Sequence, residues 1–239
     1  MEVYDLNKLG KIEEGIFLER LNRFVGKIRV KNRVYSCHIA DTGRLKEILT
    51  KDRKIWIVKN RAELKTDYKL ISAEMENDEM VLVNTSIHTK IALSSIKMGV
   101  LGFIPDKIKP EFKFGNSRLD FLINGNILVE LKASNLLVEN RCLFPDAPTE
   151  RGVKHLKELL EAKRKGYESI ILIMGLRDCD CFLPNKNLDT KFFDTFFNVL
   201  SGGVKFIGFK IRINKENKKI YINGKMEICK NPPLLKPNS

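Results

Sequence analysis

Short apolar runs with the residue types of β-strands fill the first third of the chain. They cover residues 15–20, 24–30, 34–39, 54–58, 69–73 and 80–83. One helix is predicted between them, because Thr42 can cap its N-terminus and Leu45, Ile48 and Leu49 form an apolar stripe at i, i+3 and i+4. A five-stranded barrel with an inserted helix is the organisation of the OB-fold, a common carrier of oligonucleotides. The pattern therefore predicts an OB-like β-barrel over residues 1–86.

Helical periodicity begins after the barrel and alternates with buried strands. The predicted helices cover residues 87–98, 149–166 and 189–200. Residues 169–174 are apolar without alternation, which is typical of a strand buried on both faces, and a last strand is expected over 205–211. The fold class is therefore α/β (α+β), with a mixed-sheet domain flanked by helices over residues 87–230. A loose, proline-rich tail is expected over 231–239.

The segment of residues 116–132 is predicted to be a hairpin with an Asn-Gly turn. Side chains alternate along a strand, so Glu130 and Lys132 share one face. If the loop holds three residues, 124–126, Ile123 pairs with Ile127, and Asp120 lies opposite Glu130.

A two-residue loop would instead pair Asp120 with Val129, and the carboxylates would be separated unless a bulge restored the register. The register therefore tests whether Asp120, Glu130 and Lys132 form one site.

Asp120, Glu130 and Lys132 together have the arrangement of a metal-dependent phosphodiesterase site. Asp120 and Glu130 would bind a hard divalent cation, Mg²⁺ or Mn²⁺, through oxygen. Lys132 would orient a water molecule or stabilise the leaving charge, so these three are the candidate catalytic residues. Glu111 is a candidate third carboxylate, or else the partner of a nearby Arg. The alternative for the whole pattern is an ordinary solvated sheet face.

The charge of the chain favours a polyanionic partner. Lys and Arg number 43 against 30 Asp and Glu, which gives a formal charge of +13 and a pI near 9.5. DNA is the leading candidate, either single- or double-stranded, and a second copy of the chain is a further candidate partner. No long apolar run and no signal-peptide pattern is present, so we expect a cytoplasmic protein without a membrane partner.

Five scattered cysteines suit a reducing compartment better than a disulfide framework. Cys179-Asp180-Cys181 is compatible with a zinc ligand pair or a redox pair. A strand end or turn explains it equally well, because no second Cys/His pair at finger-like spacing accompanies it.

Basic residues that could contact DNA occur in both halves of the chain. The candidates are Arg20, Arg23, Arg44, Arg118, Arg151 and His155. Arg20 and Arg23 belong to a basic run beside Phe24 and Tyr35, which suits phosphate contacts with some base stacking, and Arg44 lies near the start of the predicted helix. A solvated charged face is the alternative. Arg151 and His155 open a helix, where an N-terminus favours anions.

The order strand, hairpin, helix, strand, helix, strand around these charged groups is the arrangement of the PD-(D/E)XK nuclease core. The chain also resembles the sugar fermentation stimulation protein A family nearly end to end. The matching positions are Asn22-Arg23-Phe24, residues 38–44, Glu111, residues 115–121, Val129-Glu130-Leu131-Lys132, residues 144–152 and His155-Leu156.

The resemblance implies DNA binding, an N-terminal OB-like domain and a C-terminal domain of nuclease-like fold. It leaves catalysis open, since family members were first linked to regulation of sugar metabolism. The two function classes are a non-catalytic, regulatory DNA-binding protein and a Mg²⁺- or Mn²⁺-dependent deoxyribonuclease. An RNA-binding module is a weaker alternative.

Overall fold

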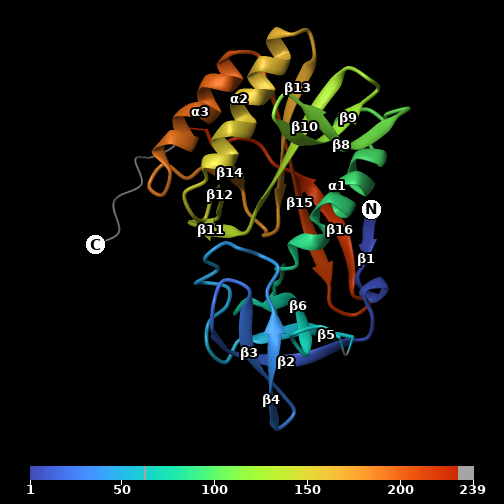
Figure 1. The fold of residues 1–239 in the computed structure, drawn as a ribbon, viewed down its shortest axis with the longest axis vertical. Coiled ribbons are helices and arrows are strands. Elements are labelled where there is room, and N and C mark those ends of the chain that lie inside the picture. The colour runs from blue at the N-terminus through green and yellow to red at the C-terminus, as the bar shows by residue number, and fades with distance from the viewer. Residues whose placement is uncertain (62, 231–239) are drawn as a thin grey trace. The chain divides into compact units, whose positions relative to one another are not determined.

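The computed structural model describes residues 1–61 and 63–230 (Figure 1). The chain divides into two compact units. Unit 1 contains Met1–Ile91 and Ile211–Ile222, and unit 2 contains Ala92–Lys210 and the described residues from Asn223 onwards. The expected tail at 231–239 lies outside the described residues. The domain boundary expected at residue 86 stays a prediction.

Unit 1 is built around a barrel of six strands, and every strand predicted in this region is confirmed. The strands are β2 (Ile12–Arg20), β3 (Val25–Val30), β4 (Arg33–His38), β5 (Lys54–Lys59), β6 (Tyr68–Glu74) and β7 (Met80–Leu82). Their order is β4-β3-β2-β5-β6-β7, and a parallel pairing of β4 with β6 at Cys37 and Tyr68 closes the barrel. Closure leaves few unpaired edges, and inward side chains such as Phe17 and Ile28 fill the interior.

The helix predicted after Thr42 is wrong. Its apolar residues Leu45, Ile48 and Leu49 are buried as the stripe requires. However, Leu45 has a φ of 50°, and only a single turn closes, with Leu49 N donating to Leu45 O at 2.8 Å. A right-handed helix cannot continue through a left-handed residue, so the segment stays a loop.

Four further elements of unit 1 or its boundary have weak sequence signals. They are β1 (Glu2–Asp5), η1 (Leu6–Leu9), η2 (Thr85–Ile87) and β16 (Lys219–Lys225). β1 pairs antiparallel with β16 at Glu2 and Tyr221. β1 has only four residues, so its strand conformation depends on this pairing with β16.

Unit 2 has the mixed sheet that was predicted for this half of the chain, with parallel strands at its centre. Its main strands are β8 (Ile108–Phe114), β9 (Ser117–Ile123), β10 (Ile127–Ser134), β13 (Glu168–Gly175) and β15 (Lys205–Asn214). They lie in the order β15-β13-β10-β9-β8, with β13 parallel to both β10 and β15. The apolar run of β13 is buried throughout from Ser169 to Gly175, which confirms the predicted central strand.

The helices predicted for this half of the chain are confirmed. They are α1 (His88–Lys97), which begins at the end of unit 1, α2 (Glu150–Arg164) and α3 (Thr190–Ser201). Helices α2 and α3 lie side by side, and α2 packs on β9, β10 and β13 (Figure 1). Phe192 and Phe196 are fully buried in this layer, as core residues rather than base-stacking groups. The mixed α/β fold class is therefore confirmed. None of the described helices is long and apolar enough to cross a membrane.

Two disulfides beside a small sheet contradict the prediction that the cysteines form no disulfide framework. The sheet is formed by β11 (Leu136–Val138), β12 (Arg141–Phe144) and β14 (Cys181–Pro184), with β12 and β14 parallel. Disulfides join Cys142 to Cys179 and Cys181 to Cys229, across Cα separations of 5.6 and 5.0 Å, and Cys37 is a buried free thiol. The Cys-x-Cys pair is therefore neither a zinc ligand pair nor a mutual redox pair here. Spacing along the chain could not reveal these partners, because sheet pairing brings them together.

Candidate functional site

The hairpin formed by β9 and β10 has the register that a three-residue loop requires. Ile127 pairs with Ile123, and the register continued to the next positions places Asp120 opposite Glu130. Asn124 opens the turn with a φ of 49°, a conformation that Asn tolerates. The alternative two-residue loop is excluded, and the two carboxylates lie on facing strands.

Glu130 is the centre of a buried charged cluster. Its side chain is on β10, and only 1% of the residue is exposed. Its Oε1 atom accepts from Nζ of Lys132 and from Nδ1 of His155, which lies on α2. Burial by itself would raise the pKa of Glu130, but Lys132 and the His155 hydrogen bond hold that pKa below its usual range. Glu130 is therefore a carboxylate held in its charged form inside unit 2.

Asp120 is the second acid of the cluster, and its pKa is shifted in the opposite direction from that of Glu130. Its Oδ2 atom accepts from the backbone N of Leu131 at 2.7 Å. Burial and the negative charge of Glu130 raise the pKa of Asp120 to about 6, against the opposing effect of Lys132. Two acids whose environments push their pKa values apart are typical of functional sites.

His155, which was predicted to contact DNA, lies in this buried cluster beside Glu130 and Lys132. It is 5% exposed, and Nζ of Lys132 lies 3.4 Å from its Nδ1. Arg151 Nε donates to His155 Nε2 at 3.5 Å, so the ring proton is assigned to Nδ1, which donates to Glu130. The sequence did carry a signal for this burial, because His155 lies one turn before Leu159 on the apolar stripe of α2.

The donor set suits a hard cation with water as its remaining ligands. Oε2 of Glu130 is buried and has no hydrogen-bond partner, and an orphaned carboxylate oxygen in the interior is costly unless a cation satisfies it. Among the described residues, no group of three or more His, Cys, Asp or Glu side chains is arranged to hold a metal ion. A cation would therefore have Asp120 and Glu130 as protein ligands, an arrangement that Mg²⁺ accepts because it keeps several waters.

Comparison with known proteins identifies the family. Residues 18–83 match the family model of the SfsA N-terminal OB domain, and residues 83–217 match that of the sugar fermentation stimulation protein RE domain. The chain belongs to the sugar fermentation stimulation protein family. The predicted OB-like barrel is thus confirmed as the N-terminal OB domain of that family.

Relatives in the sugar fermentation stimulation protein family match over most of their length. The homolog from Sulfolobus acidocaldarius is 39% identical over 233 residues, covering 95% of this chain and 93% of the relative. The homolog from Thermosipho melanesiensis is 37% identical, covering 84% and 87%. The solved structure of Pyrococcus furiosus SfsA in complex with Ca²⁺ has a TM-score of 0.85 and 29% identity, covering 96% of this chain and 99% of that one.

Glu111, the predicted third carboxylate, does not join the buried acids. Continuing the β8–β9 register from Pro110 and Phe121 places it opposite Asp120. However, its φ is 53° and its side chain is 74% exposed, with Arg118 Nη1 lying 3.6 Å from its Oε2. The left-handed backbone therefore turns Glu111 out of the strand face, and the exposed pair with Arg118 matches the alternative considered for it.

Arg20 does not offer its guanidinium to a ligand in this structure. Its Nη1 and Nη2 atoms donate to the backbone oxygens of Gly43, Arg44, Arg23 and Asp41, at 2.6 to 3.0 Å. Arg23 and Arg44 are exposed, as are Arg118 and Arg151 of unit 2. These four arginines fit the predicted role of surface contacts, whereas Arg20 holds loops together.

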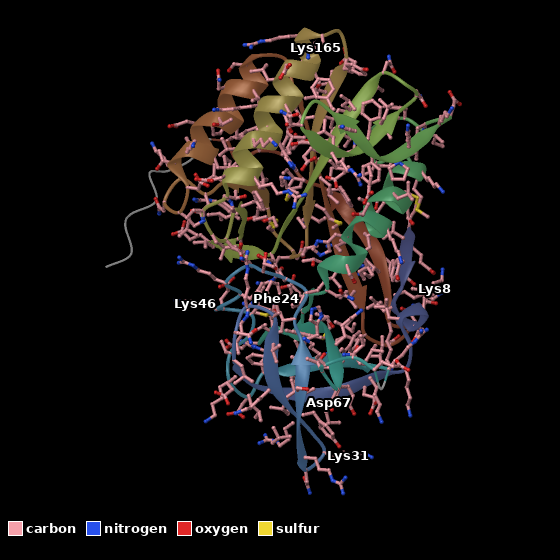
Figure 2. The ribbon with its side chains drawn as sticks, in the orientation of Figure 1. Lys8, Phe24, Lys31, Lys46, Asp67 and Lys165 are labelled. Atoms are coloured by element: carbon pink, nitrogen blue, oxygen red, sulfur yellow. A yellow bond between two sulfur atoms is a disulfide. The ribbon has the colours of Figure 1, made fainter. Side chains whose placement is uncertain are left out.

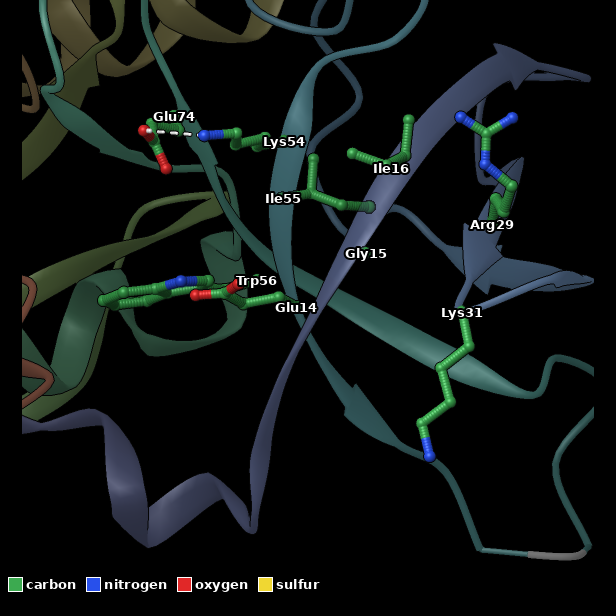
Figure 3. Close-up of a pocket in the computed structure, with 9 residues that line it drawn as sticks. All are labelled: Glu14, Gly15, Ile16, Arg29, Lys31, Lys54, Ile55, Trp56 and Glu74. Carbon is green, nitrogen blue, oxygen red and sulfur yellow. Dashed lines mark ion pairs between the residues drawn. The ribbon is translucent and has the colours of Figure 1, made fainter.

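Unit 1 also contains a hollow of about 190 Å³ beside β2 and β5 (Figure 3). Arg29, Lys31 and Lys54 line it, but so do Glu14 and Glu74. Nζ of Lys54 lies 3.9 Å from Oε1 of Glu74, so part of its charge is already balanced. Mixed charge of this kind does not favour a polyanion, and the hollow is not a candidate DNA site.

Proposed function

We propose that this protein binds DNA and holds a divalent cation, Mg²⁺ or Mn²⁺, between Asp120 and Glu130. The observation that carries the proposal is the partnerless oxygen Oε2 of buried Glu130, beside a second acid on the facing strand. The net charge of +13 supports a polyanionic partner. The relative from Pyrococcus furiosus was solved in complex with Ca²⁺, a cation with the same preference for oxygen ligands.

The cation, when bound, would neutralise phosphate charge and lower the pKa of a bound water. The side chains of the cluster have separate tasks around it. Glu130 is kept ionised by Lys132 and His155, so it is a ligand at neutral pH. Asp120, with a pKa of about 6, is mostly ionised at pH 7 and becomes fully so when a cation is bound. The proposed role of the site is to bind phosphate of the DNA, as part of a regulatory function.

A deoxyribonuclease is the second candidate, and Lys132 is the observation that favours it. Its side chain is only 13% exposed, and its ammonium touches Glu130 rather than solvent. An ammonium held at that position can stabilise charge that develops on a phosphate during hydrolysis.

One set of variants tests the proposal and separates the two candidates. Asp120→Asn and Glu130→Gln remove ligand charge, and Glu111→Gln is the matched control because it changes an exposed acid on the neighbouring strand. Fluorescence anisotropy with labelled DNA measures affinity at rising salt, and isothermal titration calorimetry measures Mn²⁺ and Ca²⁺ binding. Cleavage of single-stranded, duplex and branched DNA is followed with Mn²⁺ present.

The wild type and Glu111→Gln should bind Mn²⁺ and DNA, with log Kd rising linearly with log salt. The two site variants should lose Mn²⁺ binding at least tenfold while they stay folded. Equal Mn²⁺ affinity in all four proteins would exclude the cation site, and no salt-dependent DNA binding would exclude the DNA partner. DNA cleavage by the wild type that disappears in Asp120→Asn would favour the nuclease function. No DNA cleavage by the wild type would favour the regulatory DNA-binding function.

A further inference from the structure

An aromatic side chain stands exposed on one of the short loops of unit 1. Residues 21–24 connect β2 to β3, and Leu21 and Phe24 are 49% and 48% exposed. The two side chains are close neighbours in the chain, so they place an aliphatic group and an aromatic ring together on one short loop. Figure 2 shows this ring at the opposite end of unit 1 from Lys31.

The loop is held rigidly by hydrogen bonds to its backbone. Asn22 Oδ1 accepts from the backbone N of Phe24 at 2.9 Å and from that of Val25 at 3.0 Å. Ile39 N donates to Phe24 O at 2.8 Å, which ties the loop to the next segment of the barrel. The ring is therefore presented in a fixed place, and a ligand that stacks on it has little ordering cost to overcome.

Arg20 extends this rigidity to a second loop. Its guanidinium bonds the backbone oxygen of Arg23 on one side and those of Asp41, Gly43 and Arg44 on the other. The carboxylate of Asp41 is used within its own loop, because its Oδ1 accepts from Gly43 N at 2.7 Å. One guanidinium therefore fixes the relative positions of the side chains that both loops present to solvent.

Those side chains form one surface of apolar and cationic groups. We call it the Phe24 surface, and it consists of Leu21, Arg23, Phe24, Arg44 and Lys46, all exposed. The guanidinium carbon of Arg23 lies 5.9 Å from the centroid of the Phe24 ring. The acid in this part of β2, Glu19, is neutralised by Lys27 at 2.8 Å. The Phe24 surface therefore attracts a polyanion and offers it one aromatic face.

We infer that the Phe24 surface binds single-stranded DNA by stacking an unpaired base on Phe24, with Arg23, Arg44 and Lys46 contacting the backbone. The inference rests on the proposed function, since it names the form of DNA that is bound. In a duplex the faces of each base are covered by the neighbouring bases. Only an unpaired base can therefore stack on the Phe24 ring. Arg20 acts as a positioning residue that holds the ring and the cations in register.

The test uses the full chain and a short oligo-dT that carries one 2-aminopurine, whose fluorescence reports stacking. Phe24→Ala removes the ring, and Val34→Ala is the matched control. Val34 is 59% exposed and lies next to Arg33 at the β3–β4 turn of the same unit. Arg20→Lys keeps the charge but cannot reproduce the forked contacts, so it tests the positioning role. Thermal unfolding verifies that all variants are folded.

Phe24→Ala should weaken single-strand binding about 5- to 150-fold, the range measured for loss of one base–aromatic stack, and abolish the fluorescence change. Duplex affinity should change about twofold or less, and Val34→Ala should match the wild type. Arg20→Lys should bind like Phe24→Ala at low salt while its duplex affinity persists.

Equal losses for Phe24→Ala and Val34→Ala, or equal losses on single-stranded and duplex DNA, would overturn the inference and leave DNA binding intact. A wild type that binds neither form would instead overturn the proposed function. An RNA of the same sequence bound tenfold more tightly than DNA would assign the Phe24 surface to RNA and refute the inference as stated.

Discussion

The Nδ1 atom of His155 contacts Oε1 of Glu130, a residue 25 positions earlier in the chain. This contact ties helix α2 to strand β10 at a point where a carboxylate is buried among charged groups. It gives the histidine a structural role as well as a functional one, because Glu130 loses a donor if the ring is removed. Buried charges that lose a partner destabilise a fold far more than exposed ones do.

His155→Leu should lower the free energy of unfolding by roughly 2–4 kcal/mol, since it leaves Glu130 with one donor fewer in the interior. His155→Gln keeps a donor and should cost about half as much. Urea unfolding measures both, with Lys157→Gln as the control because that side chain is exposed on the same helix. A loss of less than about 0.5 kcal/mol in His155→Leu would contradict the buried contact.

The raised pKa of Asp120 predicts a pH dependence of stability. Its pKa rises from 3.8 in the unfolded chain to about 6 in the folded protein, so the folded form binds the proton more tightly. Its contribution is therefore fully present below pH 4 and is lost as the pH rises through 6, by roughly 2–3 kcal/mol. Urea unfolding at pH 4 to 7.5 without divalent cations measures it.

Asp120→Asn should lack this loss, so its stability relative to the wild type should increase across that pH window. Asp194→Asn, at an exposed acid on α3, should keep the wild-type profile. Parallel curves for the wild type and Asp120→Asn would show that the acid titrates outside the window.

The two disulfides predict that reduction lowers the stability of the fold. They join cysteines 37 and 48 positions apart, and closing loops of this length stabilises a fold by about 2–4 kcal/mol each in the chain-entropy account. Oxidised protein unfolded in guanidinium should show one reactive thiol, from Cys37, and reduced protein should show five. Five thiols before any reductant is added would rule the disulfides out.

Gly208 lies at a position in the sheet of unit 2 that has no room for a Cβ atom. A Cβ built there would lie 2.2 Å from the backbone oxygen of Met226, and backbone atoms cannot rotate away. Gly208→Ala should therefore destabilise the protein by about 3 kcal/mol or more, as overpacking and strand displacement do.

Gly166→Ala is the matched control for Gly208→Ala. Gly166 has a φ of 92° but open space around it, so its substitution costs only backbone strain, about 1 kcal/mol. Differential scanning calorimetry compares the two variants. Equal melting temperatures would show that β15 has room to move.

Local patterns along the chain determine much of this protein. The barrel strands, helices α2 and α3 and the buried strand β13 follow from periodicity, because each element buries the face that its own residues define. The Asn-Gly turn predicted the hairpin but left two loop lengths open, and the structure decided for the three-residue loop that places Asp120 opposite Glu130. Charge and the family resemblance point to a polyanion, which stays a proposal.

Contacts between distant segments decided the rest. Leu45 has the right spacing for a helix that begins after Thr42, but its left-handed φ interrupts that helix and leaves a single turn over Leu45 to Leu49. Glu111 lies in register with Asp120, and the same kind of backbone angle turns it outward. The disulfide partners, the carbonyls around Arg20 and the burial of His155 beside Glu130 each join segments that no local pattern relates. The sequence alone determined which faces are apolar and which residues carry charge, whereas only packing decided which charged groups meet, because that depends on long-range burial.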